Sequence, residues 1–220
     1  MDKAAYFQSR QAVAQDFANQ LAEELAGEQT AILALSKGGA VMGIEIAKRL
    51  HALVALLLLR HIYLPGEHSA LGVVDNNGVL TYGEDISKPF VEEFEMEYRS
   101  IIENDKMEAS RALHAIGKDG SISPHYFHEK VVILVNDFTK TGTSFKAASD
   151  FLKPVKTKRI ILVTAIAQIP AIDMMHLLGD KIFIAHSTNK ELPPEHYFKE
   201  NKIEDSEELT LLMQQTPLKW

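Results

Sequence analysis

Short apolar runs of strand length alternate with stretches of helical periodicity along most of this chain. The strand-length runs lie at 31–35, 53–59, 131–135, 160–165 and 182–185. The leucine-rich run at 53–59 favours a strand buried on both faces, with a helix as the alternative. The helical stretches lie at about 10–26, 40–50, 144–152 and 171–178. Buried strands that alternate with helices predict an α/β fold, in which helices cover both faces of a parallel sheet.

The middle of the chain interrupts this alternation. Residues 71–80 predict a hairpin, because the Asn-Gly pair in its turn favours positive φ at both turn residues. Residues 87–116 predict one long charged helix. Its expected inner side carries Phe90, Phe94, Tyr98, Ile101 and Ile102. We expect the hairpin and the long helix to form a cap over one edge of the sheet, and a tail from about 205 to dock as a helix.

The composition excludes several classes of protein. With 220 residues, 46% hydrophobic and 24% charged, the chain has the size and balance of one soluble domain. The absence of cysteine excludes disulfides, thiolate catalysis, zinc ribbons and iron–sulfur ligation. The longest apolar run is too short for a membrane span, and the first residues lack the pattern of a signal peptide, so we expect a cytoplasmic protein with no membrane partner. A net charge of −7 argues against a nucleic-acid partner, but a few local groups can still hold a small anion.

The strongest local signal follows the apolar run at 131–135. Asn136 and Asp137 end the predicted strand, and a loop of threonine, glycine and serine at 139–144 opens the next predicted helix. Backbone amides at a helix N-terminus favour an anion, and Gly142 lets the backbone approach a phosphate closely. Asp137 is placed to accept hydrogen bonds from ribose hydroxyls. An ordinary strand–helix turn with a Ser or Thr cap is the alternative. The P-loop, the dinucleotide fingerprint and the nucleophile elbow do not occur in the sequence.

Residues 131–144 resemble the 5-phosphoribosyl-1-pyrophosphate (PRPP) signature of type I phosphoribosyltransferases. That signature has an apolar strand, two acidic residues and a loop that ends Thr-Gly-x-Thr/Ser. Residues 32–39 resemble the pyrophosphate loop of the family, and residues 60–66 and 70–74 are similar to segments of an uncharacterised bacterial branch. Segments at 196–198 and 205–208 resemble the tail of that branch, so the resemblance covers nearly the whole chain in order.

The resemblance implies a type I phosphoribosyltransferase-like fold. The expected fold is a single domain over 1–220, with a central, mostly parallel five-stranded sheet flanked by helices. A small hood is expected from about 61–86 together with the C-terminal segment 186–220. Hoods of this family select the acceptor, and Tyr63 and His68 lie in this part of the chain.

The resemblance also implies an activity, which is transfer of the phosphoribosyl group from PRPP, with Mg²⁺, to an unidentified acceptor and release of pyrophosphate. Asp137 and Asn136 are the implied catalytic residues beside the ribose, and Asp137 would meet the metal indirectly, through water or PRPP. The implied 5′-phosphate site comprises Lys140, Thr141, Gly142, Thr143 and Ser144. The implied pyrophosphate site comprises Ser36, Lys37, Gly38, Gly39 and Arg60. The expected ligand is PRPP or a phosphoribosyl nucleotide, and a homodimer is left open.

Three departures from the family pattern leave the question of catalysis open. Asn136 stands where the family has an acid, so one negative charge near ribose and metal is missing. Lys140 occupies a position that is acidic in purine-salvage members, where the acid assists protonation of the base. Lys37 replaces the usual arginine and loses its bidentate fork. The alternative to an enzyme is therefore a non-catalytic protein that binds PRPP or a nucleotide as a regulator.

Overall fold

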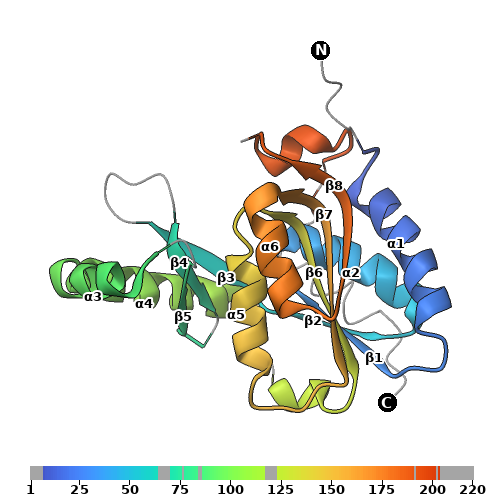
Figure 1. Cartoon of the computed structure of the whole chain (residues 1–220), viewed down its shortest axis with the longest axis horizontal. Helices are drawn as coiled ribbons and strands as arrows, with labels where there is room; N and C mark the ends of the chain where they lie inside the picture. Colours follow the sequence, from blue (N-terminus) through green and yellow to red (C-terminus); the bar gives the residue numbers. More distant parts are fainter. Residues whose placement is uncertain are drawn as a thin grey trace.

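Five parallel strands form the central sheet of the computed structural model (Figure 1). Their order is β2 (Leu53–Leu56), β1 (Thr30–Ala34), β6 (Val131–Thr139), β7 (Arg159–Gln168) and β8 (Lys181–Thr188). Each neighbouring pair is parallel. The predicted five-stranded, mostly parallel sheet is therefore confirmed.

The structure describes residues 7–63, 70–75, 77–83, 86–116, 123–190, 192–201 and 203. The predicted tail helix and His68 lie outside these residues. None of the helices in the described part of the chain has both the length and the hydrophobicity of a transmembrane span.

Helices cover the two faces of the sheet in separate layers. Helices α1 (Arg10–Glu24) and α2 (Lys37–Leu50) pack on one face, whereas α5 (Thr143–Leu152), α6 (Ile169–Leu178) and the short helix η1 (Pro124–Phe127) pack on the other. Successive side chains of a strand point to opposite faces, so Ile133 joins the first layer and Leu134 the second. Both side chains are fully buried, which explains why the predicted strand at 131–135 is apolar at every position.

The predicted strand at 53–59 is wrong in its length and burial. Strand β2 ends at Leu56, the amide of Leu57 still donates to the carbonyl of Ala34 at 2.8 Å, and the chain then leaves the sheet. All four β2 residues are half-buried, because β2 is an edge strand. Leu59 already begins a strand of a second sheet.

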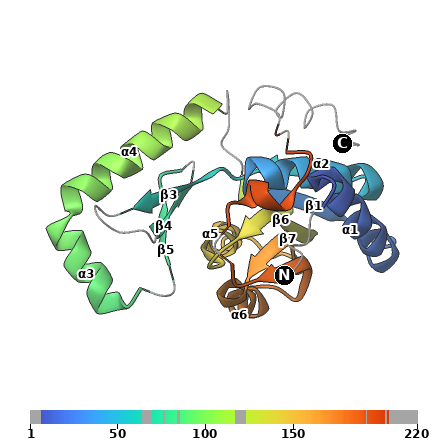
Figure 2. The same ribbon diagram turned by 90° about the horizontal axis from the view of Figure 1, so that it is seen from above.

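The second sheet has three antiparallel strands and stands beside the central body (Figure 2). Its order is β3 (Leu59–Tyr63), β4 (Ala70–Asp75) and β5 (Leu80–Tyr82). Helix α4 (Arg99–Ile116) contacts β3 and β4, and helix α5 of the central body contacts β4 and β5. Strand β4 is buried along nearly its whole length because both helices contact it.

The predicted hairpin is present, but its turn differs from the expected one. Of Asn77 and Gly78, only Gly78 has a positive φ, at 78°. The Asp75 carboxylate accepts hydrogen bonds from the amides of Asn77 and Val79, both at 2.9 Å. A longer loop held by this carboxylate therefore replaces the two-residue turn that the Asn-Gly pair predicts.

The predicted long helix is two helices, α3 (Lys88–Glu97) and α4, which meet at Tyr98. Tyr98 leaves the helical conformation, with φ −110° and ψ 19°, and its ring stacks on Phe94 at 5.5 Å between centroids. Ile102 is buried against the second sheet, but Ile101 is 37% exposed and does not belong to the inner side. The Phe90 side chain lies outside the described part.

The two ends of the described chain pair with each other. The amide of Phe7 donates to the carbonyl of Tyr197 at 2.8 Å, and the amide of Lys199 donates to the carbonyl of Phe7 at 3.0 Å. Tyr197 ends the short helix η2 (Pro194–Tyr197) and is buried in the same core as α1. This pairing holds the segment after η2 against the start of α1.

Gly72→Ala tests the packing of the second sheet. A Cβ at this position of β4 would lie 2.2 Å from the backbone oxygen of Thr81 on β5. Since backbone cannot give way cheaply, we expect a loss of about 2–3 kcal/mol in the free energy of unfolding, measured by urea denaturation.

Gly78→Asn in the turn of the same hairpin is the matched control. It meets open space at a position with positive φ, which asparagine tolerates, and should cost less than about 1 kcal/mol. Equal losses in the free energy of unfolding for the two variants would contradict the close packing of β4 against β5 at Gly72.

Candidate functional site

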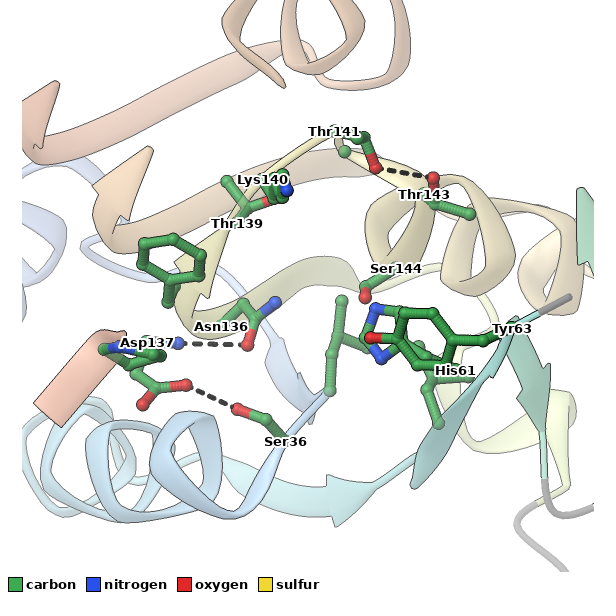
Figure 3. A pocket seen from close by; sticks show the side chains of 15 residues that line it. Ser36, His61, Tyr63, Asn136, Asp137, Thr139, Lys140, Thr141, Thr143 and Ser144 are labelled. Atoms are coloured by element: carbon green, nitrogen blue, oxygen red, sulfur yellow. Dashed lines mark hydrogen bonds between the residues drawn. The ribbon is translucent and has the colours of Figure 1, made fainter. Parts of the chain in front are cut away.

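A pocket of 390 Å³ opens where strand β6 ends and helix α5 begins (Figure 3). Parallel sheets of this type hold their ligands outside the carboxyl ends of the strands, which is where this pocket lies. The predicted site residues in its lining are Ser36, Asn136, Asp137, Lys140, Thr141, Gly142, Thr143 and Ser144. His61 and Tyr63 of β3 and Pro194 of η2 also line it. The pocket therefore combines the central body, the second sheet and the C-terminal segment.

The loop before α5 is shaped by Gly142. This residue is the N-cap of α5, has a φ of 83°, and has no side chain to cap the helix. A Cβ at Gly142 would also lie 2.7 Å from Cγ of Met174 on α6, so glycine is required for both backbone and space. The hydroxyls of Thr141 and Thr143 hydrogen-bond each other at 2.8 Å. The first turn of α5 contains no acidic residue, so its amides favour an anion.

Asp137 lies on strand β6 as predicted, but the strand does not end with it, because β6 continues to Thr139. The Asp137 side chain is only 10% exposed. The Ser36 hydroxyl donates to Oδ1 at 2.8 Å, and Nε of Arg10 donates to Oδ2 at 2.8 Å. Both oxygens of the predicted ribose acceptor are thus already held by the protein.

Arg10 is the residue that the sequence analysis missed. Its side chain is 1% exposed at the start of α1, Nη1 donates to Oδ1 of Asn201 at 2.6 Å, and the guanidinium lies 4.2 Å from the Phe198 ring centroid. Within the described residues, Nη2 has no hydrogen-bond partner. Arg10 lies on the same apolar face of α1 as Val13 and Phe17, which follow it by three and seven residues. A charged residue at a position where the helical spacing expects an apolar one was the sequence signal for a buried arginine.

The predicted pyrophosphate loop is the start of helix α2. The Ser36 side chain caps the helix by accepting from the Gly39 amide at 2.8 Å. A Cβ on Gly38 would lie 2.0 Å from Oδ2 of Asp137, and one on Gly39 would lie 2.5 Å from the carbonyl oxygen of Val135. The two glycines therefore allow α2 to start directly against β6, and neither of them lines the pocket.

The two predicted cations of the pyrophosphate site do not line the pocket either. Lys37 begins α2, and Arg60 lies exposed on β3. Arg60 and His61 are successive residues of β3, so their side chains point to opposite faces of the sheet, and it is His61 that lines the pocket. Of the predicted pyrophosphate site, only Ser36 belongs to the pocket lining.

Figure 3 shows His61 and Tyr63 on the side of the pocket opposite Asp137, with Asn136 and Ser144 between them. The two rings are tilted, with centroids 6.2 Å apart, and Tyr63 is 51% exposed. Although His61 is exposed as a residue, its ring lines the pocket, and desolvation there lowers its pKa. Asn136 is 5% exposed and accepts a hydrogen bond from the Asp137 amide at 3.1 Å.

The described donor groups do not build a metal site. Asp137 is the one carboxylate among the residues that line the pocket, and Arg10 already pairs with it. No group of three or more potential metal-ligating His, Asp or Glu side chains occurs in the described part of the chain. The residues present fit the indirect role predicted for Asp137, but not direct coordination of Mg²⁺ by the protein.

Comparison with known proteins identifies related sequences and folds. The family model described as "Phosphoribosyl transferase domain" matches residues 5–176. The crystal structure of TT1426 from Thermus thermophilus is similar over 94% of this chain and 97% of that chain, with 20% identity and a TM-score of 0.70. No protein of curated function matches the sequence.

Two further solved structures are more distant. A hypothetical protein from Neisseria gonorrhoeae with bound ppGpp has 9% identity and a TM-score of 0.50, over 86% of this chain and 85% of that chain. A hypoxanthine phosphoribosyltransferase from Staphylococcus aureus has 15% identity and a TM-score of 0.49, over 83% of this chain and 74% of that chain.

Gly38→Ala tests the contact between α2 and Asp137. The added methyl group would collide with a carboxylate that two hydrogen bonds hold in place, so we expect the free energy of unfolding to fall by about 3 kcal/mol in urea denaturation. Gly43→Ala on the same helix is the control, because its nearest neighbour is a methyl group of Ile32 at 3.2 Å. It should change stability by less than about 1 kcal/mol. A tolerated Gly38→Ala would show that Asp137 is not fixed there.

The pKa of His61 gives a second test of the pocket. Desolvation favours the neutral ring, so we expect an NMR titration midpoint below the ordinary value of about 6.5. The corresponding stabilisation is complete above that ordinary value and is lost as the pH falls through the lowered pKa. A midpoint at or above the ordinary value would contradict desolvation of the ring at the pocket.

Proposed function

The chain belongs to the phosphoribosyl transferase domain family, and from this premise we propose that it binds PRPP in the pocket beside Asp137 and transfers the phosphoribosyl group to an acceptor. The observation that carries the proposal is one shared pocket, in which a helix N-terminus suited to a phosphate lies beside a carboxylate suited to ribose hydroxyls. An ordinary strand–helix turn would need neither the buried carboxylate nor the uncapped glycine.

In this proposal the loop from Lys140 to Ser144 holds the 5′-phosphate. The first amides of α5 and the hydroxyls of Thr141, Thr143 and Ser144 are donors to its oxygens. Lys140 lines the same pocket and adds a positive charge, which suits a phosphate dianion better than the acid of purine-salvage members would.

Asp137 is proposed to accept the ribose hydroxyls. Each carboxylate oxygen has two lone pairs, and the structure uses one on each oxygen, for Ser36 and for Arg10. Asn136 is proposed to lie beside the same ribose as a neutral polar group, and the two residues keep the catalytic role that the resemblance implies.

The start of α2 is proposed to receive the pyrophosphate group, through Ser36 in the pocket lining and the amides of Lys37 and Gly38. The pyrophosphate role of Gly39 stays a prediction, because its amide already donates to the Ser36 hydroxyl oxygen. The pyrophosphate role of Arg60 stays a prediction, because this residue lies outside the pocket lining.

The acceptor is proposed to enter from the second sheet. His61 and Tyr63 present two rings on the side of the pocket away from Asp137, and Pro194 lines the pocket from the C-terminal segment. These contacts support a hood made of 61–86 and the C-terminal segment 186–220, within one domain over 1–220. They favour an acceptor with a planar ring.

In the proposed reaction a nucleophilic nitrogen of the acceptor forms a bond to the anomeric carbon of PRPP. The bond from that carbon to the pyrophosphate oxygen breaks, pyrophosphate leaves with the electron pair, and the acceptor nitrogen gives its proton to water. The pocket contributes by holding both ends of PRPP in place. Members of the family typically use Mg²⁺ with PRPP, and the indirect contact of Mg²⁺ with Asp137 stays a prediction.

Release of pyrophosphate distinguishes the proposed transferase from a non-catalytic protein that binds PRPP. PRPP binding with pyrophosphate release from at least one acceptor, in a panel of bases and amines, supports the transferase. Binding without release across the panel supports a regulatory role, which the amide at 136 would favour. No binding of PRPP at millimolar concentration would refute both.

Gly142→Ala is the mutation that tests the phosphate loop. The methyl group is strained by the positive φ and meets Met174, so the loop should shift, and we expect PRPP affinity to fall at least about tenfold, or 1.4 kcal/mol, in calorimetric titration. Gly78→Ala is the matched control, because Gly78 also has a positive φ but lies in open space outside the pocket lining. Unchanged affinity in a folded Gly142→Ala variant would move the phosphate site elsewhere.

A further inference from the structure

The negative charge of the pocket is already neutralised by the protein itself. Among the described residues that line the pocket, Asp137 is the one acidic side chain, and its partner is the buried guanidinium of Arg10. The neighbouring position 136 is an amide. The site therefore offers an approaching cation no net negative charge from these groups.

Several contacts hold the Arg10 side chain beside Asp137, so separating the two would be energetically costly. Its side chain is 1% exposed, donates to Asn201 at 2.6 Å, and lies over the Phe198 ring. The Ser9 side chain caps α1 directly before it, by accepting from the Ala12 amide at 3.1 Å. Moving the guanidinium away would leave a buried carboxylate unpaired, which typically destabilises a protein strongly.

We propose that the Arg10 guanidinium takes the place of a metal ion at Asp137, so that this carboxylate holds ribose hydroxyls without any dependence on Mg²⁺. The inference rests on the proposed function, since it assumes that a phosphoribosyl ligand occupies the pocket. Arg10 is a positioning residue in this account: it orients and neutralises Asp137, and it does not itself line the pocket.

The chemistry of the two partners supports this assignment. A guanidinium remains charged at every working pH and presents its donors in a fixed plane, so it orients a carboxylate as a metal ion would. It donates one hydrogen bond to Oδ2 and leaves a lone pair on each carboxylate oxygen for a neutral hydroxyl. A hydroxyl can use those lone pairs, whereas a divalent cation would be repelled by the guanidinium that stays beside them.

The amide at position 136 agrees with the same account. With an acid there, the pair at 136 and 137 would carry one negative charge beyond what Arg10 neutralises. With Asn136, the carboxylate and the guanidinium balance. The loss of the acid and the presence of a buried arginine are thus two parts of one electrostatic arrangement.

The experiment measures the affinity of ribose 5-phosphate, which carries the ribose hydroxyls and the phosphate but no diphosphate to bring its own metal. Calorimetric titrations are made in MgCl₂ and in EDTA. For the wild-type chain we expect the two dissociation constants to agree within about twofold. Binding that weakens by more than about fivefold in EDTA would overturn the inference and leave the proposed function standing. The absence of binding to ribose 5-phosphate and to PRPP would instead refute the proposed function.

Two variants are expected to create the metal dependence that the wild type lacks. Asn136→Asp adds a carboxylate that Arg10 does not neutralise, and it keeps the Arg10–Asp137 pair intact. Arg10→Met frees the charge of Asp137. For each we expect Mg²⁺ to tighten binding at least about fivefold, and Mn²⁺ to give an electron paramagnetic resonance signal of a bound ion. Affinity that stays independent of metal in a folded Asn136→Asp variant would contradict the inference.

The double variant Arg10→Met with Asp137→Asn is the matched control for folding. It removes both charges and leaves neither one buried alone, so it should be more stable than Arg10→Met. Because it lacks the freed carboxylate, its bound-Mn²⁺ signal should be absent. A signal as strong as that of Arg10→Met would show that the metal binds somewhere other than Asp137.

Discussion

The buried ion pair between Arg10 and Asp137 is the interaction on which the arrangement of this site depends. It joins two residues that lie 127 positions apart in the sequence. Arg10 begins α1 and contacts the segment after η2, whereas Asp137 lies on β6 and accepts from Ser36, the cap of α2. One ion pair thus fixes two helix starts, a central strand and the C-terminal segment relative to one another.

A buried pair of this kind does not stabilise a protein more than a well-packed apolar pair would. The role of the pair here is to fix the position of the Asp137 carboxylate. Because Gly38 has no side chain, the Asp137 carboxylate can lie directly against it: a Cβ on Gly38 would be only 2.0 Å from Oδ2. The same constraint explains why the segment beginning at Ser36 needs two glycines even though neither lines the pocket. They let the helix start meet the strand closely enough for Ser36 to reach Asp137.

The sequence predicts most of the central fold, because periodicity is a local property. The five strands and the helices between them follow from apolar runs and helical spacing, and the loop at 140–144 follows from its glycine and hydroxyl residues. Arg10 could not be found in this way, since its meaning comes from a partner on a distant strand. The breaks at Leu57 and Tyr98 escape sequence reasoning for a related reason, since the leucine-rich run and the charged helical stretch continue through them. Leu57 is buried in the core of the central sheet where the chain leaves that sheet, whereas Tyr98 packs against the second sheet. The resemblance to a known family supplies the assignment of roles, which periodicity alone does not contain.

Helix α5 contacts both the central body and the second sheet, which line opposite sides of the pocket. Its first turn forms the proposed phosphate site, where Gly142 rests against Met174 of α6, and the same helix contacts β4 and β5 of the second sheet. His61 and Tyr63 lie on β3, which pairs with β4. The helix that begins at the proposed phosphate site therefore packs against the sheet that carries the two rings. Because packed elements move as units rather than deform continuously, a displacement of α5 would also displace the second sheet.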